Sequence, residues 1–75
     1  MIDRGAPEVP WRQLAALLRS QIESGELAPG ARVPSTNALA QEYELSTSTV
    51  RKALRALKDE GLIIATPGYA TFVRR

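Results

Sequence analysis

The chain has 75 residues, of which 44% are hydrophobic and 24% charged, and this is the composition of one small globular domain. It contains neither cysteine nor histidine, which excludes disulfides and zinc fingers and removes the commonest general base. No apolar run approaches the roughly 20 residues of a membrane span, and the first ten residues lack the apolar core of a signal peptide. We therefore expect a cytoplasmic protein that has no cofactor and no membrane partner.

The net charge of +2 is unevenly distributed along the chain. Residues 1–45 carry a net charge of −2, whereas residues 46–75 carry +4. This asymmetry favours a polyanionic partner for the C-terminal half. Ordinary surface charge is the alternative explanation.

The first helix is expected to follow a flexible N-terminal arm formed by residues 1–10. Pro10 suits the first turn of a helix, where its missing N–H costs nothing. Apolar residues then recur with the spacing of one helical face, at positions 11, 14, 15, 18 and 22. Gly25 is the expected left-handed cap at the end of this helix.

A turn, a short strand and a second helix are expected next. Residues 29–30 are a Pro-Gly turn pair, and residues 31–33 are expected to form a very short strand. Ser35 is the expected N-cap of a short helix over residues 36–43.

The third helix is expected to complete a helix-turn-helix. Ser46 is its expected N-cap, and its apolar residues recur at i, i+3, i+4 and i+7 (Val50, Ala53, Leu54 and Leu57) up to Gly61. Only residues 44–45 separate it from the second helix. Two helices joined by so short a break cross steeply, which is the helix-turn-helix arrangement.

The last part of the chain changes from helical to strand periodicity. Residues 62–73 are β-branched and apolar on both sides of a Pro-Gly pair, which is typical of a β-hairpin. The predicted fold class is therefore mainly α with a small β-hairpin, in one domain over residues 11–75.

The start of the predicted third helix carries the candidate nucleic-acid contacts. Because the apolar residues of this helix face inward, the hydroxyl residues 46–49 and Arg51 are left at its outer face and its N-terminal end. This end of the second helix of a helix-turn-helix enters the major groove. Short hydroxyl side chains can bond phosphate oxygens or base edges there, and the helix dipole adds attraction for phosphate. Arg51 lies one turn after the start of the helix, and its guanidinium can donate two hydrogen bonds to guanine, one to O6 and one to N7.

Each of these residues also has a structural explanation. Ser46 is first of all a cap, and residues 47–49 could be solvated surface. Lys52 is better suited to contact a phosphate than to recognise a base. Arg55 and Lys58 could only solvate the helix or form weak surface ion pairs with nearby carboxylates.

A series of spaced residues matches a known family. The matches are Gly25-Glu26-Leu27, Pro29-Gly30, Val33-Pro34-Ser35, Leu39-Ala40, Ser46, Thr49-Val50-Arg51, Ala53-Leu54, Leu57 and Glu60-Gly61-Leu62. Together they resemble the winged helix DNA-binding domain of GntR-type bacterial transcriptional regulators. The resemblance covers about residues 11–73, and so many spaced matches are more specific than one short motif.

This resemblance implies a winged helix-turn-helix with three helices and a two-stranded wing. It implies DNA contacts by residues 47–49 and Arg51 in the major groove, with Gly68 at the wing tip near the minor groove. We further expect Asn37 and Lys52 to contact phosphates. The full set of candidate DNA-binding residues is Ser35, Asn37, Ser46, Thr47, Ser48, Thr49, Arg51, Lys52, Arg55, Gly68 and Tyr69.

The sequence departs from the family pattern at several positions. Asn37 stands where the family usually has an arginine on phosphate, and Thr47 stands where arginine is also common; both changes weaken the sequence-independent part of binding. At the wing, residues 68–70 are Gly-Tyr-Ala where many members have Gly-x-Gly, and Tyr69 either lies against the sugar–phosphate backbone or packs within the protein. Glu44 occupies a position often held by glycine, where φ can be positive.

The leading functional prediction is a sequence-specific regulator of transcription that binds double-stranded DNA. One alternative is a winged-helix protein-interaction module, which the modest charge and the two missing arginines favour, and another is a DNA-architectural or recombination accessory factor. An enzyme is not expected, because the hydroxyl groups have no histidine or cysteine beside them and no Gly-rich phosphate loop exists.

Members of the family normally carry a C-terminal domain that binds an effector and dimerises. Residues 1–75 stop before such a domain and are either one domain of a longer protein or a naturally minimal protein, so we expect no small-molecule effector within them. The lack of cysteine and histidine likewise predicts no metal. Formation of a homodimer would then depend on the arm, the first helix or a partner chain.

Overall fold

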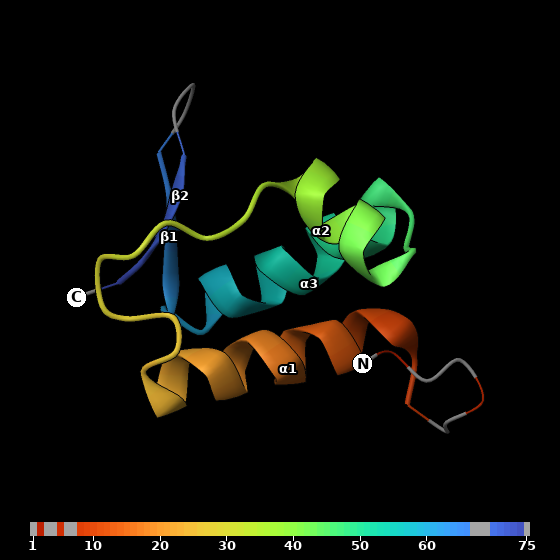
Figure 1. Cartoon of the computed structure of the whole chain (residues 1–75), viewed down its shortest axis with the longest axis horizontal. Helices are drawn as coiled ribbons and strands as arrows, with labels where there is room; N and C mark the ends of the chain where they lie inside the picture. The colour runs from red at the N-terminus through yellow and green to blue at the C-terminus, as the bar shows by residue number, and fades with distance from the viewer. Residues whose placement is uncertain (1, 3–4, 6–7, 67–69, 75) are drawn as a thin grey trace.

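The computed structural model describes residues 2, 5, 8–66 and 70–74. Within them the chain forms three helices followed by a two-stranded antiparallel hairpin: α1 (Pro10–Ser24), α2 (Thr36–Tyr43), α3 (Thr47–Asp59), β1 (Ile63–Ala65) and β2 (Thr71–Val73). In Figure 1, α1 lies beneath α3, and the hairpin rises at the end of α3 that is farthest from α2. The predicted architecture of three helices and a two-stranded wing is confirmed.

Local sequence signals set the ends of the first two helices. Pro10 occupies the first turn of α1, and Gly25 ends it with a φ of 86°, a conformation that glycine adopts without steric cost. The Ser35 hydroxyl accepts a hydrogen bond of 3.1 Å from the Ala38 N–H and so caps α2. Among the described residues, no helix is long and apolar enough to cross a membrane.

The end of α3 directs the chain straight into the hairpin. Gly61 has a φ of 78°. Its N–H donates to the Lys58 carbonyl at 3.0 Å, and the Leu62 N–H donates to the Leu57 carbonyl at 3.0 Å. These two bonds form a Schellman motif, which satisfies the last carbonyls of the helix. Because β1 begins one residue after Leu62, this cap positions the wing relative to α3.

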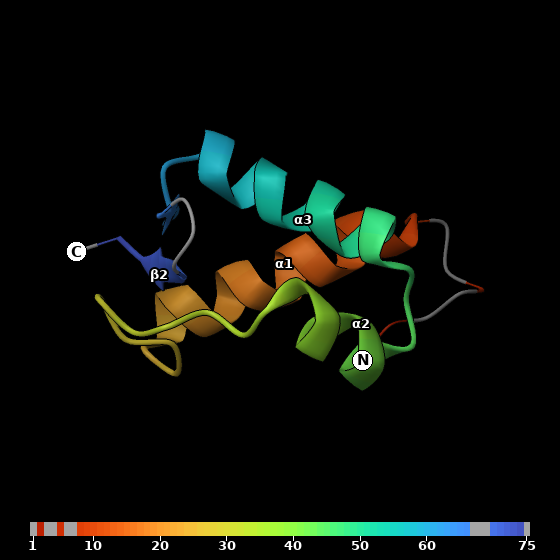
Figure 2. The ribbon, with the colours of Figure 1, turned by 90° about the horizontal axis from the view of Figure 1, so that it is seen from above.

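One small core holds the helices and the hairpin together. Its ten buried residues are Leu14, Ala15, Leu18, Val33, Leu39, Val50, Ala53, Leu57, Ile63 and Val73. From above, α1 is seen between α3 and α2 (Figure 2). Three of the core residues come from one face of α3 (Val50, Ala53 and Leu57), so burial fixes the rotation of this helix and leaves its opposite face in solvent.

The strand predicted over residues 31–33 is reduced to a single bridge. Arg32 pairs with Phe72 in an antiparallel bridge on the outer side of β2, and the Val33 N–H donates to the Thr71 carbonyl at 2.8 Å. Pro34 follows immediately and has no N–H to continue the ladder. This segment nevertheless joins the loop before α2 firmly to the wing.

Candidate nucleic-acid interface

The four hydroxyl residues at the start of α3 fall into two pairs. The Ser46 hydroxyl accepts a hydrogen bond of 3.1 Å from the Thr49 N–H, and the two side-chain oxygens of these residues lie 2.9 Å apart. Ser46 is therefore the predicted cap, and Thr49 is bound to it. The hydroxyls of Thr47 and Ser48 make no hydrogen bond with any described residue, and Ser48 is exposed. These two hydroxyls are the ones available to a ligand.

A basic stripe runs along the outer face of α3. Arg51, Arg55 and Lys58 are exposed and follow one another at i, i+4 and i+7, so they lie on one side of the helix. Lys52 is also exposed, but its position on the helix turns it away from this stripe. The buried residues on the other face of α3 hold the stripe outward.

The basic stripe borders a groove of about 510 Å³ between α3 and the wing. On the helix side the groove is lined by the three stripe residues with Leu54 and Asp59, and on the wing side by Ile63, Ala65 and Thr71. Its floor is apolar and its helix wall carries three cations against one carboxylate. Such a groove suits a chain of negative charges with apolar sugars between them.

The cations of α1 are paired within the protein, whereas those of α3 have no ion-pair partner among the described residues. Among the described residues, ion pairs join Arg12 to Glu8 at 3.7 Å and Arg19 to Glu60 at 2.6 Å. The Arg19 guanidinium holds the pKa of the Glu60 carboxyl below its usual value, chiefly through their hydrogen bonds, and Glu60 in turn raises the pKa of Arg19. No basic residue of α3 forms an ion pair with a described residue. The positive charge available to a polyanion therefore lies on α3.

The start of α1 is likewise engaged within the protein. The Arg12 guanidinium lies 5.4 Å from the centre of the Trp11 ring, in a cation–π contact. Trp11 itself is half-buried against the core. The described residues at the start of α1 therefore present no large exposed aromatic surface.

The turn between α2 and α3 sets the direction of α3. Glu44 lies in the left-handed region with φ 54° and ψ 49°, as the family pattern implies for this position. The Leu45 N–H donates to the Ala40 carbonyl at 2.9 Å and closes the turn. Burial, helped by the Glu42 carboxylate, raises the pKa of the neighbouring Tyr43. The short left-handed turn makes the two helices cross steeply and presents the N-terminus of α3 to solvent.

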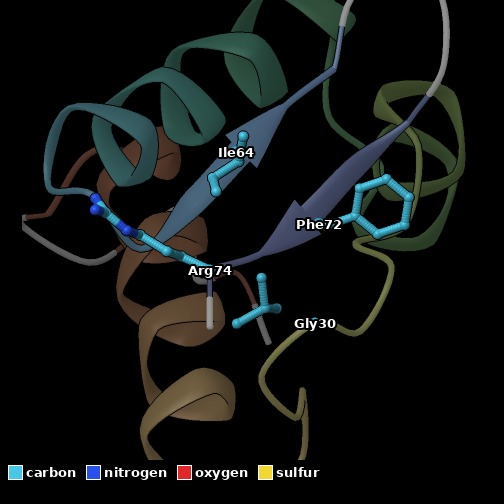
Figure 3. Close-up of a pocket in the computed structure, with 5 residues that line it drawn as sticks. Gly30, Ile64, Phe72 and Arg74 are labelled. Atoms are coloured by element: carbon cyan, nitrogen blue, oxygen red, sulfur yellow. The ribbon is translucent and has the colours of Figure 1, made fainter.

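The other face of the hairpin has a different chemistry. A hollow of about 460 Å³ is lined there by Gly30, Ile64, Phe72, Val73 and Arg74. Figure 3 shows Ile64 on β1 and Phe72 on β2, where the two residues are backbone partners. Ile64 is 50% exposed. Among the described residues that line this hollow, Arg74 alone is charged, so this face suits a phosphate backbone less well than the groove beside α3.

The structure brings most of the predicted site residues together. Seven of them share α3 and its cap (Ser46, Thr47, Ser48, Thr49, Arg51, Lys52 and Arg55), and Ser35 and Asn37 lie at the start of α2, where Asn37 is exposed. Gly68 and Tyr69 lie outside the described residues. The sequence prediction left Lys58 and Arg32 out of the site. Lys58 could have been found, since it is seven residues after Arg51 on the same helix, whereas only the bridge to Phe72 places Arg32.

The fold and this surface define a class of protein. A helix-turn-helix with an outward basic recognition helix and an adjoining two-stranded wing is a winged-helix domain of the DNA-binding type. Comparison with known proteins gives the family.

The chain belongs to the gntR family of bacterial regulatory proteins, whose sequence profile matches residues 10–73. It is 41% identical over 71 residues to an uncharacterised HTH-type transcriptional regulator of Streptomyces coelicolor, covering 93% of this chain and 26% of that protein. It is also 41% identical over 64 residues to the mannosyl-D-glycerate transport/metabolism system repressor MngR of Escherichia coli, covering 85% of this chain and 27% of that protein. The chain thus spans about a quarter of the length of these curated relatives.

Solved structures agree with this assignment. YtrA from Sulfolobus acidocaldarius, a GntR-family transcription factor, superposes with a TM-score of 0.94 at 32% identity, over 100% of this chain and 79% of that one. The DNA-binding domain of AraR in complex with operator ORX1 gives a TM-score of 0.87 at 29% identity, over 97% of this chain and 94% of that one. The chain is therefore a winged-helix domain of a family of DNA-binding transcriptional regulators.

Proposed function

We propose that this chain is the DNA-reading domain of a transcriptional regulator and binds double-stranded DNA in a sequence-specific way. The observation that carries the proposal is the outer face of α3, where exposed cations that form no ion pair with a described residue adjoin two hydroxyls that form no hydrogen bond with one. The AraR domain, which has the same fold, is seen with its operator. MngR, which shares the sequence pattern, is named a repressor.

In the proposed complex, the N-terminal half of α3 lies in the major groove. Thr47 and Ser48 bond base edges or phosphate oxygens, and Arg51 reads guanine through its two-pronged guanidinium. The Thr49 hydroxyl lies beside that of Ser46, and the Thr49 methyl group can contact a thymine methyl. The positive end of the α3 dipole favours a phosphate at the same place.

Phosphate contacts fix the position of the domain on the duplex. Lys52 and Arg55 extend from α3, and Ser35 and Asn37 lie at the start of α2, where they can reach the sugar–phosphate backbone. Asn37 donates without a charge, so this contact adds little to the salt-dependent part of the affinity. The wing residues Gly68 and Tyr69 approach the neighbouring minor groove.

The whole regulator is proposed to act as a dimer on two half-sites. A helix-turn-helix dimer reads a pseudo-palindrome whose halves are about one helical turn apart, so one domain alone has only half of the specific contacts. We therefore expect the isolated chain to bind a single half-site weakly, with affinity restored when two copies are held together.

Fluorescence anisotropy of the purified chain tests the proposal. One labelled duplex is enriched from a random-sequence pool by repeated selection on the chain, and a second has random sequence; both are titrated at about 50 and 200 mM salt. Tighter binding to the selected duplex and a clear loss of affinity at higher salt are expected. Failure of selection, together with no binding to either duplex at low salt, would contradict the proposal and favour a protein-interaction module.

A further inference from the structure

A second groove continues the first one toward α2. It encloses about 200 Å³ and is lined by Arg32, Val33, Pro34, Ser35, Thr36, Leu54, Ala70 and Thr71. Leu54 and Thr71 also line the groove beside the basic stripe. The two hollows therefore meet at these residues and form one seam between the wing and the helix-turn-helix, with Arg32 and Ser35 at one end and Lys58 at the other.

The seam is basic along its length. Its lining includes four cations, Arg32, Arg51, Arg55 and Lys58, and one carboxylate, Asp59. None of the four cations forms an ion pair with a described residue, and all four are exposed. The floor between them is apolar, formed by Val33, Leu54, Ile63 and Ala65.

Arg32 is held at the seam by its backbone. The segment around it is joined to β2 on both sides of the Arg32–Phe72 bridge, because the Val33 N–H donates to the Thr71 carbonyl at 2.8 Å and the Val73 N–H donates to the Ala31 carbonyl at 2.8 Å. The backbone that carries this charge is therefore fixed near the start of α2, where Asn37 provides no charge.

We propose that one sugar–phosphate strand of the bound duplex lies along this seam, with Arg32 and Lys58 as phosphate contacts at its two ends. The inference rests on the proposed function: if α3 occupies the major groove and the wing the adjoining minor groove, the ridge that separates these grooves is a single sugar–phosphate backbone, and it must pass between α3 and the wing. Arg32 and Lys58 read no base, since they contact only the ridge.

The test compares Arg32→Gln and Lys58→Gln with the wild-type chain on the selected duplex and on random duplex. Loss of one phosphate contact lowers the slope of log affinity against log salt by about 0.9. Each variant should therefore weaken binding about 3.5-fold more at about 50 mM than at about 200 mM salt. Because a phosphate contact carries no sequence information, this change should be equal on both duplexes.

A matched control is Arg12→Gln on α1, where the cation is paired with Glu8 and lies outside the seam; its salt slope should equal that of the wild type. Circular dichroism melts of each variant establish that the fold is kept.

Unchanged slopes for Arg32→Gln and Lys58→Gln, with wild-type binding intact, would overturn this inference and leave the proposed function standing. A change confined to one variant, or to the selected duplex, would also overturn it. Absence of wild-type binding would overturn both.

Neutral methylphosphonate linkages, placed one at a time along each strand of the selected duplex, locate the contacts. The linkage that abolishes the effect of Arg32→Gln and the linkage that abolishes the effect of Lys58→Gln should lie on the same strand. If they lie on opposite strands, the single-strand path is wrong.

Discussion

Arg19 in the middle of α1 and Glu60 at the C-terminal cap of α3 are joined by two parallel hydrogen bonds. The Arg19 Nε atom lies 2.8 Å from Glu60 Oε1, and the Nη2 atom lies 2.6 Å from Oε2. Such two-pronged pairs are directional as well as attractive. Because Glu60 immediately precedes Gly61 and the wing, this pair ties α1 to the point where the chain leaves the recognition helix.

Replacing Glu60 by Gln should lower the melting temperature at neutral pH. The Arg19 hydrogen bonds hold the pKa of Glu60 below its usual value. A carboxyl group whose pKa is lower in the folded state stabilises the fold at pH values above its unfolded-state pKa of about 4.3. This stabilisation is lost as the pH falls through the folded-state pKa. The difference in melting temperature between wild type and Glu60→Gln should therefore be largest near neutral pH and shrink in acid.

Circular dichroism melts at about pH 7 and about pH 3 measure this difference. Glu8→Gln is the control, because it removes an exposed pair of 3.7 Å that should contribute little at either pH. A difference for Glu60→Gln that stays constant between the two pH values would show that the carboxylate charge does not stabilise the fold.

Replacing Glu44 by Gly should stabilise the domain. Glu44 has a φ of 54°, and the left-handed conformation costs a residue with a β-carbon about 1 kcal/mol relative to glycine. Glu44→Ala keeps this conformational cost while removing the carboxylate, so it separates the charge from the backbone effect. We expect Glu44→Gly to have a free energy of unfolding about 1 kcal/mol above that of Glu44→Ala in urea titrations. Equal stabilities would mean that the turn relaxes when the side chain is shortened.

The helices and the hairpin could be predicted from the sequence because residues close to each boundary determine where the element begins or ends. Pro10, Gly25, Ser35, Ser46 and Gly61 act on the backbone within one turn of their own positions, and the structure places each of them at a helix end. The hydroxyls and Arg51 could be placed on the outer face for the same reason, since the helical period alone sets α3's inward and outward residues.

Contacts between distant segments could not be predicted in this way. Arg19 and Glu60 are 41 residues apart, and their meeting depends on how far α1 and α3 are rotated about their own axes, which periodicity does not determine. Arg32 reaches the wing only because its backbone pairs with Phe72. The seam between the wing and the helices is a product of such packing, so the sequence pattern identified Arg51 and Arg55 on its α3 wall but not its full extent.

Replacement by alanine should lower the stability at Ser46 and leave it nearly unchanged at Ser48. The Ser46 hydroxyl accepts the Thr49 N–H at 3.1 Å, so Ser46→Ala should cost about 1 kcal/mol of stability, the usual value for a lost N-cap. Ser48 makes no hydrogen bond with a described residue and is exposed, so Ser48→Ala should change stability by less than about 0.5 kcal/mol. Urea titrations measure both changes.

Anisotropy titrations of the same two variants on the selected duplex separate an effect on DNA binding from an effect on stability. Ser48→Ala should weaken binding without a change in stability, by about 1 kcal/mol for one lost hydrogen bond. If Ser48→Ala binds like the wild type, Ser48 is a solvated surface residue and not a DNA contact.

Arg51 should act as a base reader, and a comparison of two substitutions distinguishes this role from a general charge effect. Arg51→Ala removes both the charge and the guanidinium fork, whereas Arg51→Lys keeps the charge and loses the planar two-pronged geometry. On the selected duplex, Arg51→Ala should cost about 1–3 kcal/mol of binding free energy and relax the preference at the contacted base pair. Arg51→Lys should relax the same preference while keeping the wild-type salt slope. Anisotropy titrations against the selected duplex and its single-base variants measure both effects. If Arg51→Lys retains the full base preference, Arg51 contributes charge alone, and the sequence must be read by Thr47, Ser48 and the wing.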